Sequence, residues 1–146
     1  MITHMQPRYT MCEKIFFIFL LSFFLNVLWE HMHSYLYAGY MGGAITEGIL
    51  LRASIVDASI IAILSLPFVC IAVARNWSWI IIVIGVLIAV AIELYALHTG
   101  RWAYNEYMPI IPILSVGLTP TIQLGLLGYL SYRLVAEKTF AKNNLK

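Results

Sequence analysis

The chain has 146 residues, of which 62% are hydrophobic and only 11% are charged. A soluble domain of this size carries about 25% charged residues, so the composition excludes an ordinary soluble domain and predicts a multi-pass membrane protein. The net charge of +2 is too small to indicate nucleic acid as a partner. The two cysteines, Cys12 and Cys70, are far apart and do not have a metal-binding spacing.

Four hydrophobic stretches are long enough to cross a membrane, which takes about 20 apolar residues per helix. In chain order they cover approximately residues 15–37, 53–74, 77–97 and 110–132. Pro67 lies inside the second stretch, where a membrane helix tolerates it as a kink. We therefore expect an all-α fold, in which residues 1–146 form a single polytopic domain, a membrane four-helix bundle.

The distribution of Lys and Arg predicts the orientation of the bundle, because an excess of these residues marks the cytoplasmic side. With four spans, both termini and the loop around Arg75 lie on one side of the membrane. The opposite side holds only Arg52 and Arg101 of the nine Lys and Arg residues. This asymmetry predicts that both termini of the multi-pass protein are cytoplasmic.

Each expected helix carries one face of polar or small side chains at intervals of three or four residues. Such a face lets helices approach closely in lipid, so we expect these faces to meet inside the bundle. Gln123 lies on another side of the fourth helix and is expected to bond to a neighbouring helix. In chain order the four faces contain Ser22, Asn26, Glu30, His33 and Tyr37; Ser54, Ala58, Ala62 and Ser65; Gly85, Ala89 and Glu93; and Gly117, Thr121, Gly125 and Gly128.

Three carboxylates, Glu30, Asp57 and Glu93, lie inside or at the edge of these apolar stretches. At a rise of 1.5 Å per residue, all three lie roughly 7–10 Å below the same, outward membrane boundary. An ionisable group at such a depth is a candidate functional residue, because burying it costs several kcal/mol. Neighbouring carboxyl groups can supply one proton donor and one base, so we predict that these three residues are catalytic.

The outward half of the chain also supplies six candidate ligand-binding residues: His33, Arg52, His98, Arg101, Trp102 and Tyr104. The two arginines are expected to hold a polar headgroup or to tune the acids, and the aromatic residues to shape the pocket wall. The predicted function is to bind or transform a lipid or isoprenoid by acid–base chemistry. Membrane lipids, a lipid-like small molecule and a second copy of the chain are the expected partners. The sequence assigns no cofactor.

Other interpretations of the same residues remain open. Arg52 and Arg101 can form buried ion pairs with Asp57 and Glu93, in which case the chain is a non-catalytic membrane subunit or an oligomerising scaffold. The Trp102 region can be an aromatic belt at the headgroups instead of a ligand wall. Ion or proton translocation has little support, because few polar residues continue toward the inner face.

A metal site is a further interpretation of the same region. Glu30 and His33 form a Glu-x-x-His pair that shares one helical face, a motif that di-iron bundles use twice. The motif occurs only once in this chain. A zinc site completed by His98 has only a weak spacing signal, so no metal ligands are assigned.

Three segments carry a recognisable pattern: residues 26–37 contain WExxH, residues 52–58 read RASIVDA, and residues 100–120 contain GRWxY, MP and GLTP. This pattern resembles a family of small uncharacterised multi-pass membrane proteins of bacteria. The resemblance implies which residues matter, but it implies no chemistry. Glu93 followed by Gly100-Arg101-Trp102-Ala103-Tyr104 is also similar to a motif of the membrane carotenoid cyclases and hydratases, although their Pro-Glu-Glu feature is missing. That similarity implies protonation of a polyene by an acidic residue.

Overall fold

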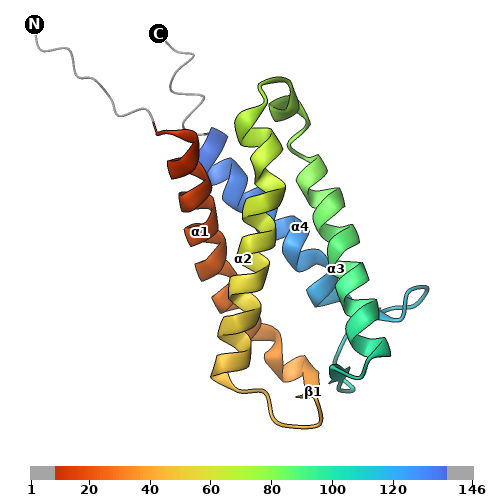
Figure 1. Cartoon of the computed structure of the whole chain (residues 1–146). Coiled ribbons are helices and arrows are strands. Elements are labelled where there is room, and N and C mark those ends of the chain that lie inside the picture. The colour runs from red at the N-terminus through yellow and green to blue at the C-terminus, as the bar shows by residue number, and fades with distance from the viewer. Residues whose placement is uncertain (1–8, 138–146) are drawn as a thin grey trace, which may run out of the picture.

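The computed structural model describes residues 9–137 and is built mainly of four helices (Figure 1). These are α1 (Met11–His33), α2 (Glu47–Cys70), α3 (Ile80–His98) and α4 (Leu118–Tyr132). The segments Met11–Leu36, Glu47–Cys70 and Ile80–His98 are each long and apolar enough to cross a membrane. The structure thus confirms a mainly helical protein with candidate membrane spans.

Short helical turns extend or connect the long helices. A 3₁₀ turn (η1, Ser34–Leu36) follows α1, a second one (η2, Val73–Trp77) joins α2 to α3, and a π-helical segment (η3, Arg133–Glu137) continues α4. The start of α1, the η2 connection and the end of α4 lie at one end of the bundle, and β1 lies at the other (Figure 1). The prediction that both termini are cytoplasmic assumed that the four helices alternate in direction in this way.

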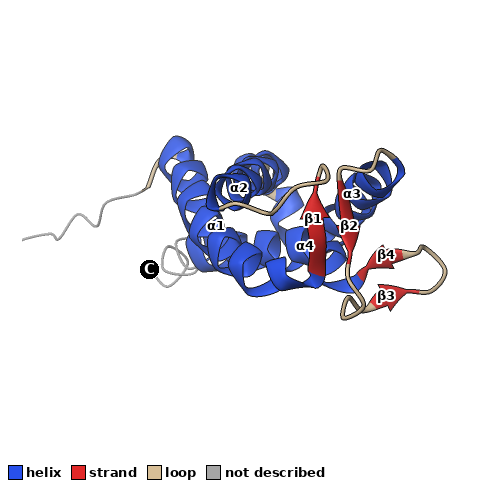
Figure 2. Ribbon diagram, turned by 90° about the horizontal axis from the view of Figure 1, so that it is seen from below, coloured by secondary structure: helices blue, strands red, loops and turns tan. Residues whose placement is uncertain are grey.

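Two small antiparallel sheets add strands to the predicted all-α architecture. Strand β1 (Tyr37–Tyr40) pairs with β2 (Trp102–Tyr104), and β3 (Ile110–Ile111) pairs with β4 (Val116–Gly117) (Figure 2). The β1–β2 pair joins the segment after α1 to the segment after α3. Its pairing satisfies backbone groups that have no helical partner where the chain leaves these two helices.

The fourth helix differs most from its predicted extent. The prediction began it at residue 110, but residues 110–117 form the β3–β4 hairpin and α4 begins at Leu118. Pro109 and Pro112 explain the difference, because proline lacks an amide hydrogen and its ring disfavours a helical residue before it. The 15 residues of α4 rise only about 22 Å, which is shorter than a hydrocarbon core of about 30 Å.

The helices pack through the predicted polar and small faces. Gly85 on α3 lies so close to α4 that a Cβ atom there would come within 2.6 Å of Gly125 Cα. Most members of the four faces are buried: Ser22, Asn26, His33, Ser54, Ala58, Ala62, Ser65, Gly85, Ala89, Glu93, Gly117, Thr121, Gly125 and Gly128. This part of the prediction is confirmed, and it places the three acids toward the interior of the bundle.

Candidate functional site

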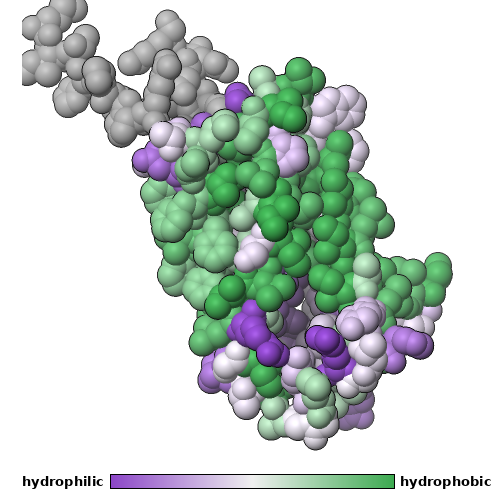
Figure 3. All heavy atoms as spheres, in the orientation of Figure 1, coloured by the Kyte–Doolittle hydropathy of each residue, from purple (hydrophilic) through white to green (hydrophobic). Residues whose placement is uncertain are grey.

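A cavity of about 750 Å³ lies among all four helices at the end that carries β1 and β2. Glu30 of α1, Asp57 of α2 and Glu93 of α3 all line it, so the fold brings the three predicted acids together. The rest of its wall is largely apolar and comes mainly from α2, α3 and α4. Figure 3 shows the surface hollowed near this end, between hydrophilic residues and beside hydrophobic helix surfaces.

Gln123 of α4 connects two of the three acids. Its Nε2 atom lies 2.7 Å from Glu30 Oε1, 3.0 Å from Asp57 Oδ2 and 2.9 Å from Asn26 Oδ1. Gln123 and Asn26 are buried, whereas Glu30 and Asp57 are half-buried and face the cavity. One amide group therefore links α1, α2 and α4 and fixes the positions of two carboxyl groups.

The stoichiometry of these contacts bears on the chemistry of the two carboxyl groups. An amide NH₂ has two hydrogens, but three acceptor oxygens surround the Gln123 nitrogen. Because Glu30 Oε1 and Asp57 Oδ2 both lie within hydrogen-bond distance of the Gln123 nitrogen, the two carboxyl groups are close to each other. In residues 9–137 neither carboxyl lies within salt-bridge distance of a cation. Two close carboxyl groups without a counter-ion form an arrangement that can share a proton.

Glu93 is held by a separate set of donors, all from the β1–β2 pair. The Tyr104 hydroxyl donates a short hydrogen bond to Glu93 Oε2, Trp102 Nε1 donates to the same oxygen at 3.2 Å, and the Tyr37 hydroxyl donates to Oε1 at 3.5 Å. The backbone amide of Gly117 donates to the Tyr104 hydroxyl oxygen at 2.9 Å. The two strands therefore position this carboxyl from outside its own helix.

The two tyrosines beside Glu93 have perturbed acidities. Burial, together with the neighbouring Glu93 carboxyl group, raises the pKa of Tyr37 well above its ordinary value. The pKa of Tyr104 is raised by burial and by its hydrogen bond to Glu93. Both hydroxyls are protonated at neutral pH, as ordinary tyrosines are, and the raised pKa values extend this hydrogen-bond-donating state to higher pH.

Arg52 and Arg101 line the cavity but do not pair with its acids. Arg52 Nη2 donates to the Tyr40 hydroxyl at 2.9 Å, and its guanidinium lies 5.8 Å from the centre of that ring. The Arg101 guanidinium lies 5.4 Å from the centre of the Tyr95 ring. Within the described part of the chain the one salt bridge is His31–Glu47. The ion pairs of these arginines with Asp57 and Glu93, considered from the sequence, are therefore not formed among residues 9–137.

Aromatic rings form one side of the cavity. Tyr40 and Trp102 are stacked with their ring centres 6.4 Å apart, and Tyr37 meets Trp102 edge-on at 6.2 Å. The His33 ring contacts Tyr37 at 5.5 Å, and its Nδ1 lies 2.7 Å from the Trp29 carbonyl oxygen. His33, Tyr37, Tyr40 and Trp102 all line the cavity, which favours a pocket wall over a simple interfacial belt.

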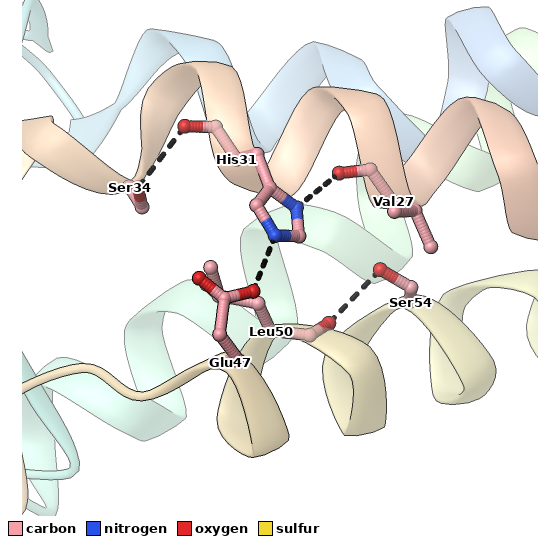
Figure 4. A network of polar contacts seen from close by, with 6 residues as sticks. All are labelled: Val27, His31, Ser34, Glu47, Leu50 and Ser54. Atoms are coloured by element: carbon pink, nitrogen blue, oxygen red, sulfur yellow. Dashed lines mark hydrogen bonds and ion pairs between the residues drawn. The ribbon is translucent and has the colours of Figure 1, made fainter.

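A polar contact outside the cavity ties α1 to the start of α2 (Figure 4). His31 Nε2 lies 2.7 Å from Glu47 Oε2, and His31 Nδ1 lies 2.7 Å from the Val27 carbonyl oxygen. Because both partners of the ring are acceptors, this geometry matches a doubly protonated imidazole. The contact fixes the spacing of the two helices on one side of the cavity.

Two predicted ligand-binding residues lie outside the cavity wall. His98, at the end of α3, is exposed and does not line the cavity, and Tyr104 reaches it only through its bond to Glu93. Among residues 9–137 there is also no group of three His, Cys, Asp or Glu residues that could hold a metal ion. The zinc interpretation based on Glu30, His33 and His98 therefore finds no support in this geometry.

Gln123, Tyr37 and Tyr40 complete the site but were not among the predicted site residues. Gln123 is the one residue with an amide side chain within residues 110–132. A single amide in an apolar segment is the sequence feature that could have marked it as a site residue. The predicted contact of Gln123 with a neighbouring helix is confirmed.

Comparison of the chain with protein-family models, with curated proteins and with solved structures returned no match. The site therefore has to be interpreted from its own geometry.

Proposed function

We propose that the chain is a multi-pass protein of a bacterial inner membrane, with both termini cytoplasmic. Its outward-facing, acid-lined pocket binds or transforms a lipid or isoprenoid by acid–base chemistry. One observation carries this proposal: a single cavity of about 750 Å³ collects Glu30, Asp57 and Glu93, none of them in a salt bridge with another residue of 9–137. The volume lies within the range of pockets that enclose a small molecule or part of a larger one.

The position of the cavity supports a ligand dissolved in the membrane. Its walls include apolar side chains of two candidate spans, such as Val56 of α2 and Ile92 of α3. Val56 is 50% exposed, so the cavity wall reaches the outer, lipid-facing surface of its helix. A hydrophobic molecule can then enter from the side, between α2 and α3, without crossing water.

The paired carboxyl groups can carry out proton transfer without an external oxidant or reductant. A protonated member of the Glu30–Asp57 pair gives its proton to an alkene carbon of the ligand, which leaves a carbocation. The ionised partner or Glu93 then removes a proton from an adjacent carbon, which forms a new double bond. The net result is isomerisation of the alkene, with one proton gained and one lost. Cyclisation keeps the same proton balance when a second alkene of the ligand attacks the carbocation and forms the ring bond before the proton is removed. The aromatic wall stabilises the cationic intermediate.

A second candidate function has its own structural support. Gln123 joins α1, α2 and α4 through Asn26, Glu30 and Asp57, which is how a polar network specifies the packing of membrane helices. On this basis the chain would be a non-catalytic membrane subunit or an oligomerising scaffold. Its buried polar groups would then serve assembly alone.

Native mass spectrometry of the detergent-purified protein, with lipid extraction and metal analysis of the same sample, separates the two functions. We expect a stoichiometric lipid or polyene that is lost in Glu93→Gln and in Asp57→Asn. Glu106→Gln is the matched control, because Glu106 is an exposed acid that follows β2 and does not line the cavity. If the cavity variants lose assembly or thermal stability while the bound-ligand content is unchanged, the scaffold is correct and the proposal is wrong.

A further inference from the structure

Two cationic side chains at the cavity have no anionic partner in the described residues. Arg52 of α2 and Arg101, which follows α3, both line the cavity, and neither forms a salt bridge within residues 9–137. A guanidinium stays charged at every physiological pH and carries five N–H donors in a planar fork. Two such groups beside a largely apolar cavity form a site for an anion.

The two guanidinium groups are already positioned by tyrosines. The Tyr40 hydroxyl accepts one hydrogen bond from Arg52, and the Tyr40 ring in turn stacks on Trp102. Arg101 lies over the Tyr95 ring, and its backbone carbonyl accepts a hydrogen bond from Met41 N at 2.7 Å. Arg52 donates one hydrogen bond to the Tyr40 hydroxyl, and the Arg101 side chain donates none within residues 9–137, so most of the five N–H donors of each guanidinium remain available.

The positions of the arginines relative to the acids define the shape of the ligand. Arg52 precedes Asp57 by five residues on α2, which separates them by about 7.5 Å along the helix axis. Arg101 adjoins Trp102, whose indole N–H binds Glu93. An anionic group held by the arginines therefore lies closer to the β1–β2 end than the carboxyl groups do. An apolar chain attached to such a group would pass the carboxyl groups in the cavity.

We propose that Arg52 and Arg101 bind the phosphate headgroup of an amphiphile whose apolar chain occupies the cavity. Phosphate fits this arrangement because its several oxygens can accept from two separate guanidinium groups at once. This inference rests on the proposed function and narrows its ligand class from any lipid or isoprenoid to phosphate-bearing ones. It assigns the arginines to ligand recognition, and it leaves proton transfer to the acids.

Matched pairs of ligands test the role of the headgroup. Binding to the full-length protein in dodecyl maltoside, a detergent without phosphate, is measured at constant detergent concentration. The probes are farnesyl monophosphate against farnesol, dioleoylphosphatidic acid against dioleoylglycerol, and inorganic phosphate alone. We expect at least one phosphate lipid to bind about 10- to 100-fold more tightly than its neutral partner, the usual range for hydrogen bonds to a charged group.

Arginine variants then identify the residues responsible. Arg52→Gln and Arg101→Gln are each expected to remove most of the preference for phosphate, and Arg52→Lys to retain part of it. Arg133→Gln is the matched control, because Arg133 also lies over a tyrosine ring, at 5.6 Å from the centre of Tyr129, but does not line the cavity. Melting temperature and elution volume of each variant show that it remains folded.

The outcomes separate this inference from the proposed function. If the neutral and phosphate lipids bind equally tightly, the headgroup inference is overturned while the lipid pocket stands. If inorganic phosphate binds as tightly as the phosphate lipids, the site takes a free anion, which also overturns the inference. If no lipid of either pair binds, both the inference and the proposed function fail.

Discussion

The hydrogen bonds of Gln123 allow the sharpest test of how the site is built. Gln123→Met keeps an unbranched side chain of similar volume but removes the amide that contacts Asn26, Glu30 and Asp57. A buried hydrogen bond contributes roughly 1 kcal/mol in proteins generally and about 0.6 kcal/mol on average between membrane helices. With two amide hydrogens shared among three acceptors, we expect a loss of about 1–3 kcal/mol in the free energy of unfolding.

Thermal unfolding in detergent, followed by the loss of helical circular dichroism, measures this loss. For a chain of this length, 1 kcal/mol corresponds to roughly 2–4 °C, so the melting temperature is expected to fall by about 2–12 °C. A double-mutant cycle with Asn26→Leu separates one contact from the others, because the effect of Gln123→Met shrinks when one acceptor is already absent. If Gln123→Met melts at the wild-type temperature, the amide does not hold the helices together and the reasoning is refuted.

Three further predictions concern packing, the Glu93 contacts and pH. Gly85→Ala is expected to lower the free energy of unfolding by about 1–3 kcal/mol, because its new Cβ atom would overlap α4. The control is Gly48→Ala, also in a helix, where the atom nearest to the new Cβ is 3.9 Å away. This control is expected to leave the melting temperature unchanged or slightly higher. Glu93→Leu removes the acceptor of Trp102 and Tyr104 and is expected to cost about 1–3 kcal/mol per unsatisfied donor. Glu93→Gln keeps one side-chain oxygen that can accept from Trp102 and Tyr104, so only the leucine variant is expected to shift the tryptophan fluorescence emission. Equal emission shifts in the two variants would show that the contact with Trp102 does not depend on this oxygen. Because the pKa of Tyr104 is raised in the folded protein above its ordinary value of 10.0, its contribution to stability is complete below about pH 10 and is lost as the pH rises further. Between pH 8 and 11.5 the melting temperature of Tyr104→Phe is therefore expected to fall less steeply than that of the wild type. If the two melting temperatures fall equally steeply with pH, the pKa of Tyr104 is not raised in the folded protein.

The sequence alone was sufficient to predict the class of the protein and the inward faces of its helices. Hydrophobic length and a spacing of three or four residues are local properties, and membrane helices satisfy their own backbone hydrogen bonds. The same local reasoning placed Glu30, Asp57 and Glu93 at one end of the bundle, and the structure brings them into one cavity. A local signal that the prediction did not use is the capping box of Thr10 and Glu13, which starts α1 at Met11 instead of residue 15.

Only the tertiary structure decided which partners these side chains take. Glu93 and Tyr37 are 56 residues apart in the chain, and their contact depends on the pairing of β1 with β2. Arg52 takes Tyr40 and not Asp57 as its partner, and Gln123 contacts side chains of two other helices, α1 and α2. Both outcomes likewise depend on how the helices rotate and cross. Such contacts carry no periodic signal, because they are set by the relative positions of elements that are distant in sequence. The sequence therefore located the acids, and the packing of the helices and strands determined what holds them.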